Sequence, residues 1–373
     1  MRPPGPPPAA DAGFSLIEML VAMAIVLVVM AAAASAVSDV YRSADTARGI
    51  IEVNNNLRVG ADLMVRDFMQ AGQGLPTGRV VQVPNGDGAL RLQRPHSEGS
   101  ACTQFDAGIT ALPAVTVGPG CGPTINGVAT DMVTTLAVDT ALDSAPVNGH
   151  NVGQHRATVS TPAQAPGGLD ISTGVGDDVA VGDLMMFVKG SASALVYVTA
   201  VDGGQTFTFA PGDPMNLNQF TGNLNGTADD LLNTPPNGAN TATVSRIRMV
   251  SYYLDDTIDP STPRLIRHMN WGPPALPVNR RGLTVAFGVD NLQFTYDMVD
   301  GVTNPAGVRM EAGDLNGSGR CAPSPCSPNQ IRKMNLYLAA RSARPFSITR
   351  RLFRNALETQ VSLRSLALVD RYR

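Results

Sequence analysis

The stretch Ala12–Leu20, AGFSLIEML, decides the fold, because it begins an apolar run that continues to Val37. Met19 to Ala34 contains no polar side chain, and neither glycine nor proline interrupts the 24 residues from Phe14 to Val37. As a helix these residues are roughly 36 Å long, and the hydrocarbon core of a bilayer is about 30 Å thick. The run therefore predicts a membrane-spanning helix, with Glu18 near its beginning.

Two cleavage patterns compete for this N-terminus. An ordinary secretory signal peptide would be cut after Ala36, at the small residues ASA. Against it, Arg2 is the only basic residue before the run, and Glu18 inside an apolar region costs about 2–3 kcal/mol on insertion. The second pattern places the cut at Gly13, whose lack of a side chain suits a backbone-binding cleft.

The residues GFSLIEMLVAMAIVLV, from Gly13 to Val28, resemble the cleavage and assembly motif of type IV prepilins. The resemblance implies that prepilin peptidase cuts between Gly13 and Phe14 and that Phe14 is then N-methylated. Glu18 becomes the fifth residue of the mature chain. The leader departs from the basic leaders of the family, so the cytoplasmic N-terminus is implied by the resemblance and not by charge.

Glu18 needs a partner in lipid, because an isolated carboxylate there is costly. Side-by-side packing of helices offers the free amine of Phe14 on a neighbouring subunit. Such a pair would set the register between subunits, which is the best attested use of a buried charge. The alternative is a Glu18 side chain that reaches the lipid headgroups and has no further role.

The helix is expected to continue beyond the membrane, with charged residues on its solvated face. AGQGLP, 71–76, supplies its stop signals. The chain is therefore divided into a leader (1–13), a helix (14–72, spanning the membrane over about 14–37) and a head (73–373). Apolar residues recur at steps of three and four at Ile50, Val53, Leu57, Ala61, Met64 and Phe68. The residues expected on the solvated face are Arg58, Asp62, Arg66 and Asp67.

The head has a two-residue period and many glycines and prolines, which predicts an α+β protein whose long helix packs on a single β-rich head with long loops. We expect a hairpin at 79–95 with NGDG as its turn, a strand at Met132–Val138 and a three-stranded meander at 182–210. Further strands are expected as a pair in 244–269 and singly in 289–301, 331–345 and 359–373.

The order of these segments resembles the PilW-like minor pilins. A GDL strand precedes LVYVTAV, and VSYYLDD, PRLIR, GVDNLQFTYDMVDG, MNLYLAARSARP and VSLRSLAL follow. Together with the N-terminus this resemblance covers most of the chain, whereas residues 95–165 match no family pattern.

The four cysteines form two local pairs, Cys102 with Cys121 and Cys321 with Cys326. An even count in loops rich in proline and glycine favours disulfides and an oxidising compartment. Free thiols are one alternative. Zinc is another, although neither pair has the C-x-x-C spacing and the pairs lie far apart in sequence.

Motifs for catalysis are absent from the sequence: we find no P-loop, no G-x-S-x-G and no H-E-x-x-H, and we predict no enzyme and no cofactor. A calcium loop is one alternative to a plain polar turn at DLNGSG, where Asp314, Asn316 and Ser318 alternate as oxygen donors. The twelfth position of such a loop is Pro325, so the bidentate glutamate is missing.

Basic residues are concentrated at the C-terminal end. Residues 331–373 hold ten Arg or Lys and two acids, whereas the whole chain has a net charge of −3. We interpret this region as complementing acidic neighbours within the fold or as a partner surface. Aromatic residues are sparse there, so nucleic acid is not the expected partner.

The resemblance implies a minor pilin that takes part in assembling and priming the type IV pilus by helix packing. Its partners would be prepilin peptidase, the other minor and major pilins and the inner-membrane assembly machinery. It would cross the inner membrane once, with its head in the periplasm, and reach the cell surface after assembly. The alternatives are a type II secretion pseudopilin and a secreted or anchored β-rich adhesin that prepilin peptidase does not cleave.

Overall fold

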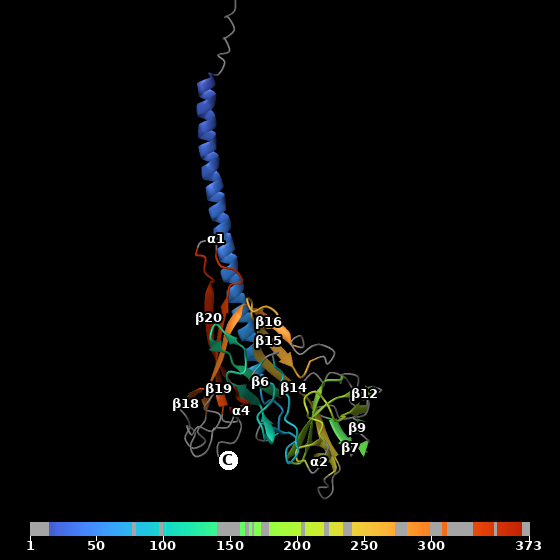
Figure 1. Cartoon of the computed structure of the whole chain (residues 1–373). Helices are drawn as coiled ribbons and strands as arrows, with labels where there is room; N and C mark the ends of the chain where they lie inside the picture. The colour runs from blue at the N-terminus through green and yellow to red at the C-terminus, as the bar shows by residue number, and fades with distance from the viewer. Residues whose placement is uncertain are drawn as a thin grey trace, which may run out of the picture.

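A long helix projects from a β-rich head in the computed structural model (Figure 1). The structure describes residues 15–76, 80–96, 100, 102–139, 157–160, 164–165, 168–172, 179–202, 206–219, 224–233, 241–272, 282–298, 308–311, 331–346 and 349–367. This architecture confirms the α+β fold class predicted from the sequence.

Helix α1 is a single uninterrupted helix, Leu16–Gln70. Alanine, leucine and methionine make up more than half of its apolar segment, and no proline occurs between its ends. It ends where Gly72 (φ 79°) and Gly74 (φ 74°) take the left-handed conformation, which glycine adopts without steric cost. The Ala71 amide donates to the Phe68 carbonyl oxygen and closes the last turn.

The largest sheet follows the order β11-β10-β14-β15-β16, and β6 and β7 also pair with the long strand β14. All of these pairs are antiparallel. Its strands are β3 (Val115–Gly118), β6 (Met132–Val138), β7 (Ala157–Ser160), β10 (Leu184–Lys189), β11 (Ala192–Tyr197), β14 (Thr241–Asp255), β15 (Arg264–Met269) and β16 (Leu283–Phe287). The strand predicted at Met132–Val138 and the pair predicted in 244–269 are confirmed.

A second antiparallel sheet has the order β18-β17-β19-β20 and is built from the C-terminal part of the chain. Its strands are β17 (Val289–Met298), β18 (Val308–Glu311), β19 (Ile331–Arg341) and β20 (Arg354–Ser362). Short helix α4 (Arg364–Ala367) follows β20, so the last predicted strand is right only in its first residues.

Three smaller sheets and a short helix also belong to the described head. A four-stranded sheet contains β8 (Gln164–Ala165), β9 (Gly168–Ser172), β12 (Ala200–Asp202) and β13 (Thr206–Thr208). Two-stranded pairs form between β1 (Val80–Gln82) and β2 (Ala111–Pro113) and between β4 (Thr124–Ile125) and β5 (Val128–Ala129). Helix α2 spans Ala228–Asn233.

Two predictions about strand pairing were wrong. The hairpin at 79–95 does not form, because β1 pairs with β2, and Asn85 and Gln93 make isolated bridges to Asn225 and Gln104. The meander at 182–210 is two hairpins in different sheets, since β11 pairs with β10 and β12 pairs with β13. At 79–95 the chain turns at NGDG, but β1 pairs with a distant segment. In 182–210 both hairpins form, and only the expected pairing between them is absent from the described residues.

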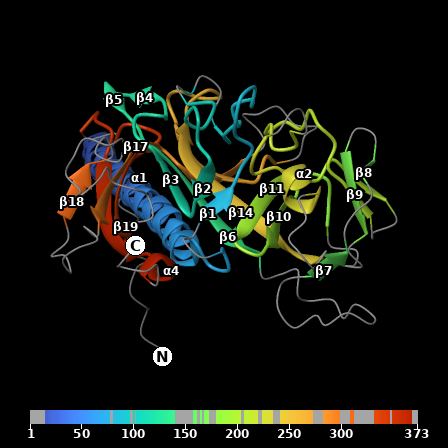
Figure 2. The same ribbon diagram turned by 90° about the horizontal axis from the view of Figure 1, so that it is seen from below.

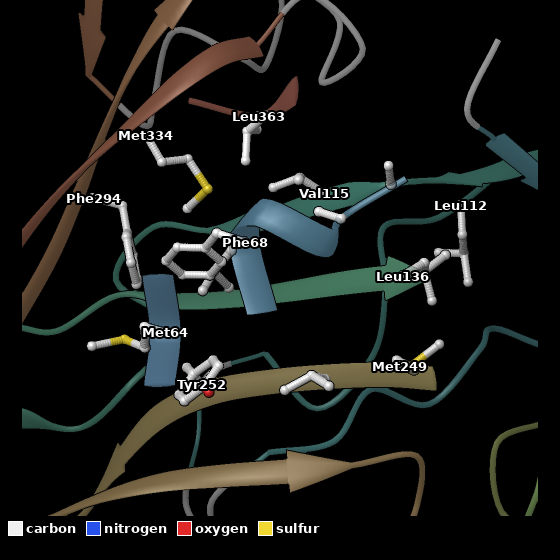
Figure 3. Packing of buried hydrophobic residues seen from close by; sticks show 14 of the residues in the cluster. Met64, Phe68, Leu112, Val115, Leu136, Met249, Tyr252, Phe294, Met334 and Leu363 are labelled. Atoms are coloured by element: carbon white, nitrogen blue, oxygen red, sulfur yellow. The ribbon is translucent and has the colours of Figure 1, made fainter. Parts of the chain in front are cut away.

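The core surrounds the head end of α1, between the two larger sheets (Figure 2). Phe68 is fully buried and meets the rings of Tyr252 and Phe294 edge to face, each at a centroid distance of 6.0 Å (Figure 3). Truncating such a buried aromatic side chain costs about 3–5 kcal/mol. The helix is therefore part of the core of the head and not merely an anchor attached to it.

Candidate functional site on the N-terminal helix

The first half of α1 is exposed on every side although it is almost entirely apolar. Leu16 is 82 % exposed and Val29 is 61 % exposed, and no residue from 16 to 37 is buried. A helix that is apolar all round requires lipid or other helices around it. Within the described part of the chain, α1 is the one helix long and apolar enough to cross a membrane.

A capping box begins the helix. The Ser15 hydroxyl oxygen accepts a hydrogen bond from the Glu18 amide (3.3 Å), and the Glu18 carboxylate accepts one from the Ser15 amide (3.1 Å). This pattern was missed in the sequence, although S-x-x-E before an apolar run is its signature. Glu18 thus has a local partner in the isolated chain. Gly13 and Phe14, the predicted cleavage and methylation residues, lie outside the described residues.

The second half of α1 is joined to the head by an ion pair between buried Asp67 and partly buried Arg267. Arg267 donates from Nε to Asp67 Oδ2 (2.7 Å) and from Nη2 to Asp67 Oδ1 (3.2 Å). The Tyr252 hydroxyl donates to Asp67 Oδ2 (2.6 Å). Asp67 is 5 % exposed, so its predicted place on the solvated face was wrong. The physical reason is that two strands supply partners that the helical period cannot reveal.

Burial and charge act together on the partners of Asp67. Burial, and then the negative charge of Asp67, raise the pKa of the Tyr252 hydroxyl well above its usual value. Burial alone lowers the pKa of Arg267, but its hydrogen bonds to Asp67 and the attraction of that charge outweigh this effect and raise it. Tyr252 therefore remains a neutral donor and Arg267 a cation, which keeps the cluster closed.

A close approach between helix and sheets occurs at Gly60. A Cβ atom at this position would lie 2.9 Å from Leu265 Cδ2 and 3.2 Å from Leu338 Cδ2, which belong to the two larger sheets. Two polar contacts secure the flanks of the helix: Asn56 donates to the Phe287 carbonyl oxygen (3.0 Å), and Asn355 donates to Asn54 Oδ1 (2.6 Å). The helix is thus fixed between β16 and β20.

The opposite face of the same half remains exposed. Tyr41, Ile51 and Val59 are 72 %, 57 % and 54 % exposed, and the charged residues Asp62 and Arg66 lie among them. This face carries both apolar and charged side chains, so it can pack against another helix outside the bilayer.

Cys102 and Cys121 form a disulfide with a Cα–Cα distance of 5.1 Å. The link closes a loop of 19 residues, and closure of a loop of this length contributes about 3 kcal/mol. The predicted pair Cys321 and Cys326 lies outside the described residues, as do the calcium candidates Asp314, Asn316 and Ser318. The Cys321–Cys326 disulfide and the calcium loop therefore stay predictions.

Comparison with protein families matches residues 9–34 to the prokaryotic N-terminal methylation motif. This chain carries a prepilin-type N-terminus. The matched range contains Gly13, Phe14 and Glu18. No curated protein and no solved structure was found to match the chain.

A prepilin-type motif implies processing by prepilin peptidase and assembly with other pilins. It supports a type IV pilin-like or pseudopilin role for the chain, which is generally structural and not enzymatic. The motif and the single exposed apolar helix are together consistent with inner-membrane anchoring followed by incorporation into a filament. The geometry adds that the same helix is built into the head.

Proposed function

We propose that this protein is a minor pilin of the type IV pilus, similar to the PilW group, that helps to assemble and prime the filament. One observation carries the proposal. The matched motif leads into a helix of 55 residues whose first half is exposed and apolar and whose second half packs one face into the core of the head. This continuous helix is about 83 Å long and couples the membrane segment rigidly to the head. A plain membrane anchor does not need such a rigid connection.

The proposed mechanism is packing of helices in register. Cleavage between Gly13 and Phe14 frees an amine next to the capping box, and Phe14 is then N-methylated. In a filament, the Glu18 carboxylate pairs with the corresponding amine of a neighbouring subunit. The capping box supports this role, since it holds the carboxylate at the first turn of the helix, close to its own chain end. A subunit packed out of step leaves both charges unpaired in an apolar surrounding, which is costly.

Mass spectrometry of the N-terminus of the mature chain tests the proposal. We expect N-methylphenylalanine at residue 14 in protein purified from membranes or from sheared pili. A chain that begins at Val37 would show ordinary signal cleavage and would remove the proposal. A chain that keeps residues 1–13 would leave the helix as a simple anchor and would contradict it equally.

Association with a pilus, as opposed to a type II secretion filament, is tested by fractionation. We expect the processed subunit in sheared type IV pili and normal export of secreted enzymes when its gene is deleted. Loss of secretion with unchanged piliation would assign the chain to the pseudopilins.

A further inference from the structure

The connection between β19 and β20 carries a basic cluster. Residues 341–357 contain five arginines and no acidic residue. Arg354 pairs with Asp290 (3.2 Å), and Arg341 donates to backbone carbonyl oxygens of Pro260 and Ser261. The remaining three arginines are exposed and form no ion pair with a carboxylate in the described part of the chain. These three, Arg344, Arg350 and Arg351, are called the basic loop.

Hydrogen bonds give the basic loop a defined shape. The Phe346 amide donates to the Arg351 carbonyl oxygen (3.0 Å), and the Arg350 amide donates back to the Phe346 carbonyl oxygen (2.8 Å). Arg350 has a φ of 52°, which tightens the turn. The Phe346 and Phe353 rings stack at a centroid distance of 5.8 Å. These contacts fix the backbone positions from which Arg350 and Arg351 project.

The loop is held against α1 on the side of the head that faces the apolar segment (Figure 1). A Cβ atom at Gly49 would lie 2.7 Å from Phe346 Cε1, so the ring rests directly on the helix. Gly49 follows the end of the apolar run, Val37, by 12 residues, or about 18 Å along the helix axis. Lipid headgroups occupy roughly the first 5–7 Å of this distance. The rest of the distance, from the headgroups to the level of Gly49, is largely within the reach of extended arginine side chains and a Debye length of about 8 Å.

We propose that the basic loop binds anionic lipid headgroups when the apolar half of α1 lies in the bilayer, an inference that rests on the membrane-anchored state of the proposed function. Guanidinium groups suit phosphate oxygens, to which they donate two parallel hydrogen bonds. The charges of α1 at the same level nearly cancel, since Asp39 and Asp45 alternate with Arg42 and Arg48. The loop thus adds three positive charges, which outnumber the exposed Asp259 beside the Pro260–Ser261 segment that Arg341 contacts. Its attachment to the membrane surface would hold the head of the waiting subunit in one orientation before assembly.

Arginine footprinting tests the inference with the full-length chain in nanodiscs of phosphatidylcholine, with and without phosphatidylglycerol. A dicarbonyl reagent modifies free guanidinium groups, and mass spectrometry reads each site. We expect the reactivity of the basic loop to fall about fivefold when phosphatidylglycerol is present and to recover at high salt. Exposed Arg66 and Arg364, which lie further along the helix and at the far end of the head, are internal controls and should not change.

Equal reactivity in both lipids, with the chain embedded, would overturn the inference and leave the proposed function intact. Failure of the chain to embed in either disc would instead count against the membrane-anchored state itself. Protection that appears only when a partner pilin is added would assign the loop to a protein neighbour and would also overturn the lipid proposal.

A matched pair of variants gives a second readout, the phosphatidylglycerol retained per chain after extraction in a mild detergent. The first variant combines Arg344→Gln, Arg350→Asn and Arg351→Gln, with asparagine chosen because it tolerates a positive φ. We expect it to retain several-fold less of this lipid than the wild type. The control, Arg66→Gln with Arg364→Gln, removes exposed charges elsewhere and should retain the normal amount. Equal loss in both variants would contradict a specific role for the loop.

Discussion

Glu18 accepts a hydrogen bond from the Ser15 amide in the isolated chain, which places its carboxylate in the first turn of α1. The same carboxylate is the proposed partner of a neighbouring amine in the filament. These two roles can be separated, because Ser15 contributes to the capping box and has no part in the proposed charge pair.

Replacing Glu18 by alanine should leave cleavage at Gly13 intact but reduce incorporation into filaments at least about tenfold, since an unpaired charge in an apolar surrounding costs more than the 1.4 kcal/mol that corresponds to tenfold. Immunoblots of sheared pili, normalised to the membrane pool, measure the effect. The control is Ser15→Ala, which costs about 1 kcal/mol of helix capping and should still be incorporated. Equal loss with Ser15→Ala would refute the charge-pairing role.

Asp67 is the residue on which the joint between helix and head depends most. Asp67→Asn leaves the partly buried Arg267 without its counter-ion, which should destabilise the fold by about 3 kcal/mol, the lower end of the range for a broken buried pair. Urea unfolding of the detergent-solubilised chain, followed by fluorescence of the single tryptophan Trp271, measures the loss. The control Asp62→Asn changes an exposed residue of the same helix and should stay within about 0.5 kcal/mol. Similar losses from both variants would show that the ion pair is unimportant.

At the scale of elements, α1 belongs to two environments. Its first half presents apolar side chains in all directions, and its second half is enclosed by β16 on one flank and β20 on the other. Gly60 permits this enclosure, because the helix backbone approaches side chains of both sheets there. The packing of the head therefore fixes the direction in which the apolar half projects.

Gly60→Leu should destabilise the head by about 1–3 kcal/mol through overpacking against Leu265 and Leu338. Asn55→Leu introduces the same side chain on the exposed face of the helix and should have little effect. Thermal unfolding of the two variants in the same detergent makes the comparison. A Gly60→Leu variant as stable as the wild type would mean that the sheets can move away from the helix without loss of stability.

For the whole molecule, the head and the second half of α1 form one folding unit. The buried contacts of the helix begin at Val53, while the loop contact at Gly49 lies slightly before it. The membrane segment is not needed for this core, because none of its residues is buried.

A chain that begins at residue 44 should therefore fold as a soluble monomer. A chain that begins at residue 62 lacks Val53, Leu57 and Ala61, and burial of a Val or Leu side chain contributes about 1.5–3 kcal/mol. Val53 and Leu57 together contribute about 3–6 kcal/mol, which reaches the lower end of the total stability of an ordinary domain, about 5–15 kcal/mol. Size-exclusion chromatography and thermal melts make the comparison. We expect a monomer with a cooperative melt for the chain from residue 44 and no cooperative melt for the chain from residue 62. Cooperative melting of the shorter chain would contradict the view that α1 belongs to the core.

Local patterns in the sequence were sufficient to predict the helix, its buried face and the prepilin-type N-terminus. Val53, Leu57, Met64 and Phe68 recur with the helical period, and a period or a motif depends only on neighbours along the chain. Strand Met132–Val138 was predictable for the same reason. The Ser15–Glu18 capping box is equally local, and reading the S-x-x-E spacing would have found it.

Only the tertiary structure decided which strands pair, where Asp67 lies and that Arg341 and Arg354 have partners within the head. In β1, Val80 pairs with Pro113, 33 residues later in the chain, and no local signal selects this partner over the nearer segment that follows the NGDG turn. Asp67 looked solvated because its partners Tyr252 and Arg267 come from strands nearly 200 residues later. Contacts of this kind form because distant segments bury apolar surface together, and that gain is a property of the folded whole and not of any short stretch.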